Sequence, residues 1–305
     1  MRMNITRMTI TKSMYIIHIN LLYLIFKWFN IIGLYFNYLK INKIKYNKMD
    51  EKIIYNNSPY KEIPDELLND YTMNGTVPIF NWYLDGTKEL LEKEWTQEYI
   101  NSFLSKYSIE NIISNKEGES PYGHDTCINL LNSFMEYDIK GKNVAVVGST
   151  SPWIEAMLIN LKNNVTTIEY NVPENKYENL QCKDYFNYFK NNKETYDAVV
   201  TYSSIEHSGL GRYGDPLDPN GDIDTMKTIH NNLLNDGLLI WGAPVGKDAL
   251  SWNAHRVYGE KRLPLLFNNF EELKWFGHSK EILFSQRLAC NAYQPVVVLK
   301  KINNI

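Results

Sequence analysis

The sequence has only three cysteines among its 305 residues: Cys127, Cys182 and Cys290. They are far apart and odd in number, so no disulfide framework is visible and no pair has the spacing of metal ligands. Such isolated cysteines are typical of small buried side chains in a protein of a reducing compartment.

Acidic residues are missing from the first part of the chain. Residues 1–49 contain no Asp or Glu but eight Lys and Arg, so their formal charge is +8. Because the whole chain has a net charge of −3, residues 50–305 have a net charge of −11. Nucleic-acid binding requires a basic surface. Because the acidic body lacks a basic stripe and any nucleic-acid-binding motif, we expect no nucleic-acid partner.

The basic segment contains a long apolar stretch, residues 14–39, with Lys27 near its middle. Its length suffices to cross a bilayer, although a central Lys costs about 2.5–3.5 kcal/mol. Three alternatives stay open: a signal anchor, an amphipathic targeting helix, or an extension upstream of a body that begins at Met49. The expected location is therefore cytoplasmic or membrane-anchored through residues 14–39.

The remainder divides by composition into two parts. Residues 50–118 are polar and aromatic, and they predict a helical lead-in or cap with a main helix over residues 87–106. From residue 119 onward, strand and helix patterns alternate. We therefore expect three parts: a basic apolar segment (1–49), a lead-in (50–118) and an α/β domain (119–305).

Short apolar or β-branched runs predict the strands of that domain. They lie at residues 143–148, 164–169, 196–201, 238–243, 272–276 and 294–299. Amphipathic helices separate the earlier runs, as in a parallel, doubly wound sheet.

Glycines are scarce in the loop after the first strand. Only Gly148 stands where a dinucleotide-binding loop has three glycines, so a pyrophosphate is not expected. Ser149 and Thr150 follow at a helix start, which suits a carboxylate or another single polar group. Glu169 ends the second strand, at the position of the carboxylate that accepts both ribose hydroxyls in nucleoside-binding α/β folds. Asp184, after a weaker strand, is either near an adenine or a solvated loop residue.

The loop of residues 202–216 (YSSIEHSGLGRYGDP) contains the densest set of ionisable groups and directly follows a predicted strand. Open α/β sheets bind ligands at such strand ends. His207, with an ordinary pKa near 6.5, suits a general base at neutral pH. Alternatively, it only ties the loop to the sheet. Glu206, the residue before it, is expected to be catalytic as well.

A second polar loop, residues 253–259 (NAHRVYG), follows the next strand. The carboxyl ends of parallel strands share one edge, so we expect His207 and His255 to face one cleft. A carboxylate beside them, Glu206 or Asp215, would complete a two-histidine-one-carboxylate metal site. No spacing requires this, so a divalent metal stays an alternative and no metal ligand is assigned.

At five motifs the chain resembles the class I S-adenosylmethionine-dependent methyltransferase superfamily and, more narrowly, the family catalogued as domain of unknown function 268. The motifs are GSTSPWIEA (148–156), TTIEYN (166–171), SSIEHSGLGRYGDPLDPNGD (203–222), GAPVG (242–246) and NAHRVYG (253–259). The resemblance covers roughly residues 70 to 280. It implies a Rossmann-like, mostly parallel seven-stranded sheet with helices on both faces, and S-adenosylmethionine as cofactor.

The leading hypothesis is an S-adenosylmethionine-dependent methyltransferase that acts on a hydroxyl of a small molecule or glycan. The alternative is a non-catalytic nucleoside-binding or membrane-tethered protein. Oligomeric state and acceptor identity stay open. The expected catalytic residues are His207, Glu206 and His255; the cofactor residues are Gly148, Ser149, Thr150, Glu169, Asp184, Ser203 and Tyr122; the acceptor residues are Arg212, Tyr213, Asp215, Asn253, Arg256 and Tyr258.

Overall fold

The structure is a computed structural model that describes residues 59–88, 94–114, 121–191, 194–285 and 292–303. The chain divides into two units, Met1–Tyr55 and Asn56–Ile305. The predicted segment at residues 14–39 lies outside the described residues. Within the described part, no helix is long and apolar enough to cross a membrane.

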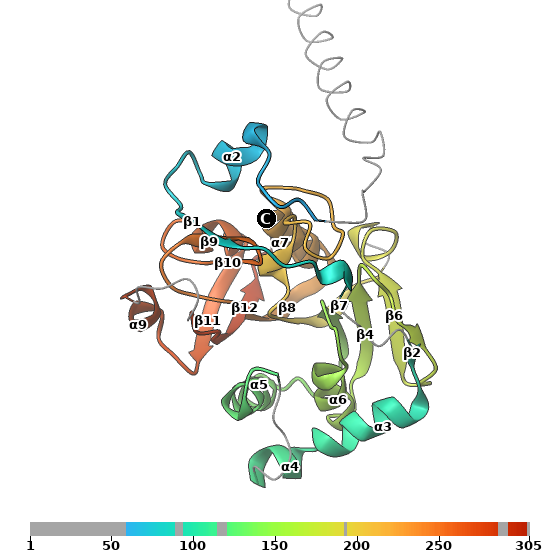
Figure 1. Cartoon of the computed structure of the whole chain (residues 1–305). Coiled ribbons are helices and arrows are strands. Elements are labelled where there is room, and N and C mark those ends of the chain that lie inside the picture. The colour runs from blue at the N-terminus through green and yellow to red at the C-terminus, as the bar shows by residue number, and fades with distance from the viewer. Residues whose placement is uncertain (1–58, 89–93, 115–120, 192–193, 286–291, 304–305) are drawn as a thin grey trace, which may run out of the picture. The chain divides into compact units, whose positions relative to one another are not determined.

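A seven-stranded sheet forms the centre of the second unit (Figure 1). Its strands, from one edge to the other, are β11 (Phe270–Phe276), β12 (Val296–Lys301), β8 (Leu233–Gly242), β7 (Tyr196–Tyr202), β3 (Asn143–Val147), β4 (Asn164–Glu169) and β6 (Leu180–Asp184). All neighbours are parallel except β12, which is antiparallel to β8 and β11. The expected Rossmann-like, mostly parallel sheet is confirmed.

The strand order places a ligand-binding position in the middle of the sheet. Counted along the chain, its first five strands stand in the order 3-2-1-4-5 of the dinucleotide-binding fold. The order reverses between β3 and β7, where the connections leave to opposite sides. Ligands of open α/β sheets bind at this switch point, beyond the carboxyl ends of the strands.

Helices cover both faces of the sheet because its buried strands are apolar on both sides. Val144 and Val146 face one core, which α5 (His124–Glu136), α6 (Trp153–Asn160), α3 (Gln97–Lys106) and α4 (Ile109–Ser114) close. Ala145 and Val147 face the other core, with α7 (Gly221–Asn232) and α8 (Leu263–Leu266). The result is a three-layer α/β/α arrangement.

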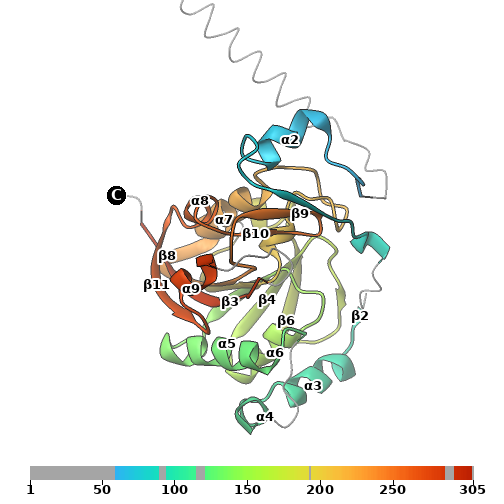
Figure 2. The same cartoon turned by 60° about the vertical axis from the view of Figure 1, so that its left-hand side comes forward.

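The segment expected to be a helical lead-in contains strands as well as helices. After α2 (Asp65–Tyr71), β1 (Ile79–Trp82) joins β9 (Ala249–Asn253) and β10 (His255–Val257) in a second sheet (Figure 2). A 3₁₀ turn, η1 (Gly86–Lys88), follows β1, and β2 (Glu94–Trp95) pairs with β5 (Glu174–Asn175). The helix predicted from residue 87 starts only at Gln97, because Thr96 caps it by accepting the N–H of Tyr99 at 3.1 Å.

The remaining short elements are η2 (Phe189–Asn191), η3 (Ile205–His207) and α9 (Lys280–Ser285). Of these, η3 is the first turn of the predicted loop 202–216, and it follows directly on the carboxyl end of β7.

Candidate active site

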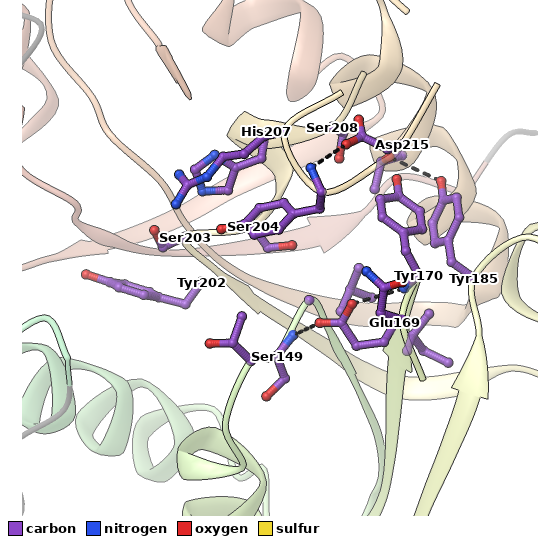
Figure 3. A pocket seen from close by; sticks show the side chains of 18 of the residues that line it. Ser149, Glu169, Tyr170, Tyr185, Tyr202, Ser203, Ser204, His207, Ser208 and Asp215 are labelled. Atoms are coloured by element: carbon purple, nitrogen blue, oxygen red, sulfur yellow. Dashed lines mark hydrogen bonds between the residues drawn. The ribbon is translucent and has the colours of Figure 1, made fainter. Parts of the chain in front are cut away.

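A cavity of about 240 Å³ lies at the carboxyl ends of β3, β4 and β7, at the switch point of the sheet (Figure 3). Its lining combines the turn after β3, the end of β4 and the loop after β7. The lining residues are Pro121, Tyr122, Val147, Gly148, Ser149, Thr150, Trp153, Ile168, Glu169, Tyr170, Asn171, Tyr185, Tyr202, Ser203, Ser204, His207, Ser208, Arg212, Tyr213, Asp215 and Thr225.

The turn after β3 accepts only glycine at residue 148. Gly148 has φ +80°, and a Cβ atom there would stand 1.7 Å from Ser204 Oγ. The β3 turn and the β7 loop therefore approach each other with no room for a side chain between them. This single glycine brings the two strand ends together and forms the floor of the pocket.

Glu169 lies beside this turn, with its carboxylate directed at the pocket (Figure 3). Its two oxygens accept the backbone N–H groups of Ser149 and Tyr170, the latter at 3.0 Å. Burial raises the pKa of Glu169 to about 7, although these two N–H groups favour the charged form. The end of the second strand thus holds a carboxyl at the pocket whose two oxygens both accept backbone N–H groups.

Aromatic side chains form two walls of the pocket. The rings of Tyr122 and Trp153 pack at 5.3 and 6.0 Å from the ring of Tyr202. On the β4 side, Tyr170 and Tyr185 pack edge to face at 5.0 Å. Of these five, the sequence analysis assigned only Tyr122. A signal existed for two others, since Tyr170 directly follows Glu169 and Tyr202 opens the predicted loop.

His207 lines the pocket, and its protonation state follows from one hydrogen bond. Its Nδ1 lies 2.6 Å from the carbonyl oxygen of Ala254, which can only accept, so Nδ1 carries the proton and Nε2 carries the lone pair. Burial, helped by the charge of Arg212, lowers the pKa of His207 to about 3. The ring is therefore neutral at physiological pH and can accept a hydrogen bond at Nε2.

Glu206 lies behind His207 and does not line the cavity. Its buried carboxyl accepts Ser203 Oγ at 2.9 Å, and its Oε1 lies 3.7 Å from His207 Nε2. Burial raises the pKa of Glu206 to about 7. Glu206, expected to be catalytic, is therefore a buried neighbour of the imidazole rather than a residue of the lining.

The pocket loop is held in shape by Asp215. Its carboxylate accepts the N–H groups of Gly209 (2.8 Å), Gly211 (3.1 Å) and Tyr213 (3.2 Å). Arg212 donates to the Ala254 carbonyl at 3.3 Å, the same oxygen that His207 contacts. The loop thereby places an imidazole and a guanidinium side by side at one end of the cavity.

Six of the predicted site residues do not line the pocket. They are Glu206, His255, Asp184, Asn253, Arg256 and Tyr258. Asp184 pairs in register with Glu169 but accepts the N–H of Asn187 at 2.6 Å, while the next residue, Tyr185, faces the cavity. The expected cleft shared by His207 and His255 is absent from this lining: the ring of His255 packs against Trp82 at 5.3 Å.

Arg256, expected to clamp an acceptor, is instead buried beneath the pocket loop. It donates to the carbonyl of Ser208 at 2.6 Å, and its Nε lies 3.6 Å from Asp222. Arg262 donates to the same carboxylate at 2.8 Å, and the hydroxyl of Tyr258 donates to it at 3.1 Å. Burial alone would raise the pKa of Asp222, but the two guanidinium groups lower it.

Asn253 is also buried, and its side chain holds two segments of the chain together. Its side-chain oxygen accepts the N–H of Leu84 at 2.8 Å, which ties β9 to the residues after β1. These contacts explain why the NAHRVYG motif needs its polar residues without placing them in the cavity. Among the described residues, no group of three or more His, Cys, Asp or Glu side chains is arranged to hold a metal ion.

Residues 141–302 match the family described as "Caenorhabditis protein of unknown function, DUF268", over just over half of the chain. The chain belongs to this family. The matched range begins just before β3 and includes the whole seven-stranded sheet, so it contains the Gly148 turn, Glu169 and the His207 loop. No curated protein is similar enough in sequence to match.

Solved structures with a similar fold include several methyltransferases. A Burkholderia thailandensis 1,6-didemethyltoxoflavin-N1-methyltransferase with bound S-adenosylhomocysteine is 13% identical, covers 67% of this chain and 87% of its own, and has a TM-score of 0.44. The N-methyltransferase NodS of Bradyrhizobium japonicum with S-adenosylhomocysteine is 10% identical, covers 67% and 99%, and has a TM-score of 0.40.

Proposed function

We propose that this protein is an S-adenosylmethionine-dependent methyltransferase that acts on a hydroxyl group. The observation that carries the proposal is the convergence of the Gly148 turn and the Glu169 carboxyl in one cavity at the switch point of the sheet. That position is where open α/β folds bind nucleosides. The imidazole of His207 stands at the other end of the same cavity.

The donor set fits an adenosyl group. The carboxyl of Glu169 offers two acceptor oxygens, as a ribose diol requires, and its present N–H partners are both backbone groups. Tyr170 and Tyr185 supply aromatic surface next to it for an adenine. The turn at Gly148 has neither the glycines nor the breadth for a pyrophosphate, which disfavours a dinucleotide. When bound, S-adenosylmethionine supplies an electrophilic methyl group.

His207 would hold the acceptor and take its proton. Nε2 carries a lone pair, so it can accept a hydrogen bond from an acceptor hydroxyl and align the oxygen for in-line attack. Transfer of the methyl group to a hydroxyl would form a C–O bond as the C–S bond of the cofactor breaks, and would leave the acceptor oxygen positively charged and strongly acidic. The O–H electron pair stays on that oxygen, while the proton moves to Nε2. Glu206, with Oε1 at 3.7 Å, can then stabilise the charged imidazole.

The low pKa of His207 favours a hydroxyl acceptor over an amine. A group with a pKa of about 3 cannot remove a proton from a free alcohol, but it can take the proton from the acidic oxygen of the freshly methylated product. A methylated ammonium holds its proton too firmly for such a base. His207 is therefore useful for O-methylation and would contribute little as a base to N-methylation.

Calorimetry with S-adenosylhomocysteine tests the proposal. We expect the wild-type protein to bind it, and Glu169→Gln to weaken binding by about tenfold or more, the effect of losing one charge-assisted anchor. Asp184→Asn is the matched control, because Asp184 is the strand neighbour of Glu169 but does not line the cavity. Failure of the wild-type protein to bind at millimolar ligand would refute the proposal.

The reduced glycine turn also supports a second candidate, a nucleoside-binding protein without catalysis. Such a protein would bind S-adenosylhomocysteine in the same way. The two functions differ at His207: methyl transfer that disappears in His207→Ala, with cofactor binding retained, supports the enzyme and excludes the non-catalytic protein.

A further inference from the structure

The residues of β1 form an exposed apolar strip, which the proposed chemistry at the pocket does not use. All four residues of β1 are exposed, and Phe80 and Trp82 each expose 46% of their surface. Contiguous exposed apolar side chains often mark a binding surface.

Phe80, Trp82 and His255 share one face of the three-stranded sheet. Phe80 pairs in register with Ser251 and Trp82 with Asn253, while His255 pairs with Ser251 from the other side. Register partners project to the same face of a sheet, and the ring contact of Trp82 with His255 at 5.3 Å agrees with this. We call these three residues the aromatic strip.

The opposite face of the same sheet is covered. There, Trp252 of β9 packs edge to face on Tyr71 of α2 at 5.2 Å, within a small core that includes Leu250. Ile79 pairs with Leu250 and so projects to this face rather than to the aromatic strip, although 37% of its surface is exposed. In both views α2 lies beside β1 (Figures 1 and 2). The sheet is therefore asymmetric, with a packed face toward α2 and an open aromatic strip.

The aromatic strip is continuous with the wall of the pocket. The chain runs from Trp82 to Gly86, whose N–H donates to the carbonyl of Arg212 at 2.9 Å. A Cβ atom on Gly86 would stand 2.6 Å from the ring of Tyr213, so the two segments are in close contact. His255 follows Ala254, whose carbonyl receives both His207 and Arg212. A molecule lying on the strip would therefore begin at the His207 end of the cavity.

We propose that the aromatic strip binds the neutral sugar rings of a glycan whose hydroxyl enters the pocket as methyl acceptor. This inference rests on the proposed function and names its substrate class. Pockets for drug-sized ligands have volumes of roughly 300–1,000 Å³, so a cavity of about 240 Å³ leaves no room for a second sugar ring beside the cofactor. An acceptor larger than a single reacting group must then lie outside it.

The charge and the chemistry of the aromatic strip favour a neutral glycan over an anionic polymer or a lipid surface. Residues 71–84 contain no Lys, Arg, Asp or Glu, so β1 itself contributes no charge that would attract an anionic polymer or anionic lipids, and the neighbouring Lys261 donates to the carbonyl of Thr76 at 2.7 Å. Sugar rings present apolar C–H faces that stack on indole and phenyl rings, together with hydroxyls that an imidazole can hydrogen-bond. Trp82 and Phe80 provide the rings for stacking, and His255 provides the imidazole.

Binding of the full chain to an array of neutral oligosaccharides built from hexoses, deoxyhexoses and N-acetylhexosamines tests this inference. We expect a subset to bind, Trp82→Ala to weaken that binding by about tenfold or more, and Trp82→Phe to retain most of it. Ile79→Ala is the matched control, because it removes exposed apolar surface from the same strand but on the face opposite Phe80 and Trp82, and it should leave glycan binding unchanged.

S-adenosylhomocysteine binding, measured on the same samples, separates the two proposals. If it binds equally to the wild type and Trp82→Ala while no neutral glycan binds, the strip inference is wrong and the proposed function stands. If neither protein binds it, the proposed function fails whatever the array shows. Trp82-dependent binding to phosphatidylcholine–phosphatidylserine vesicles without glycan binding would also overturn the inference, in favour of a lipid surface.

Discussion

Gly148 and Ser204 come from different strand ends, and a Cβ atom on Gly148 would overlap the side chain of Ser204, with 1.7 Å to Oγ. The contact fixes the distance between the turn after β3 and the loop after β7. Since Glu169 bonds to the first of these segments and His207 belongs to the second, the contact also sets how the two ends of the pocket face each other.

Gly148→Ala should therefore damage the pocket itself. We expect S-adenosylhomocysteine affinity to fall by about tenfold or more, together with a loss of stability beyond the roughly 1–2 kcal/mol that a left-handed alanine costs. Gly141→Ala is the control: Gly141 also has a positive φ (+68°), but a Cβ atom there meets nothing within 4 Å. Equal effects of both substitutions in calorimetry and chemical denaturation would contradict the steric account.

His207 should stay neutral far below the pH at which an ordinary histidine is protonated. Because burial and Arg212 lower its pKa to about 3, we expect its imidazole nitrogen shifts to remain those of an Nδ1–H tautomer between pH 8 and pH 5. Nitrogen-15 NMR, with His207→Gln for assignment, measures this. Titration of His207 near the ordinary value of about 6.5 would remove the argument for a hydroxyl acceptor.

Glu155 should make the folded state less stable as the pH rises. Its side chain is fully buried under the β3 turn, accepts Thr167 Oγ1 at 2.8 Å, and has its pKa raised by burial from 4.5 to about 7. A raised folded-state pKa gives stability that is present below pH 4.5 and lost as pH rises to 7, here about 3 kcal/mol. We expect Glu155→Gln to flatten the fall in Tm between pH 5 and pH 8; an unchanged slope would contradict this.

Loss of the Arg256 guanidinium should lower the stability of the fold much more than loss of the Arg212 guanidinium. Arg256→Met removes one guanidinium from the buried pair with Asp222, so we expect a loss of about 3–5 kcal/mol in the free energy of unfolding. Arg212→Met, at the pocket lining, should cost less than about 1 kcal/mol, as a substitution outside the core does. Urea denaturation compares them, and a mild effect of Arg256→Met would restore it as a candidate acceptor ligand.

Much of the fold could be predicted from the sequence because its signals are local. The apolar runs at residues 143–148 and 196–201 are buried parallel strands, since only such strands are apolar on both faces. The start of α3 shows the limit: it lies at Gln97, ten residues after the start that the hydrophobic spacing predicts, because the capping side chain of Thr96 decides the boundary. The sequence does not predict β1, because its four residues do not alternate between polar and apolar and because its partner strand, β9, lies far along the chain.

For the site, the sequence located the strand ends but not the direction of side chains. Gly148, Glu169 and His207 follow from the position of each strand end in a doubly wound sheet, and all three line the pocket. Arg256, Tyr258 and His255 belong to one motif, and none of them lines the pocket. Arg256 and Tyr258 lie beneath the pocket loop because both interact with the buried carboxylate of Asp222. These contacts depend on how α7, which contains Asp222, packs in the fold, and no local sequence pattern predicts that packing.

A crystal structure of the protein soaked with S-adenosylhomocysteine tests the central claim most directly. The account predicts the adenosine in the cavity between the Gly148 turn and Tyr185, with both ribose hydroxyls on the carboxylate of Glu169 and the sulfur toward His207. Ligand bound elsewhere, or a ribose that makes no contact with Glu169, would contradict it.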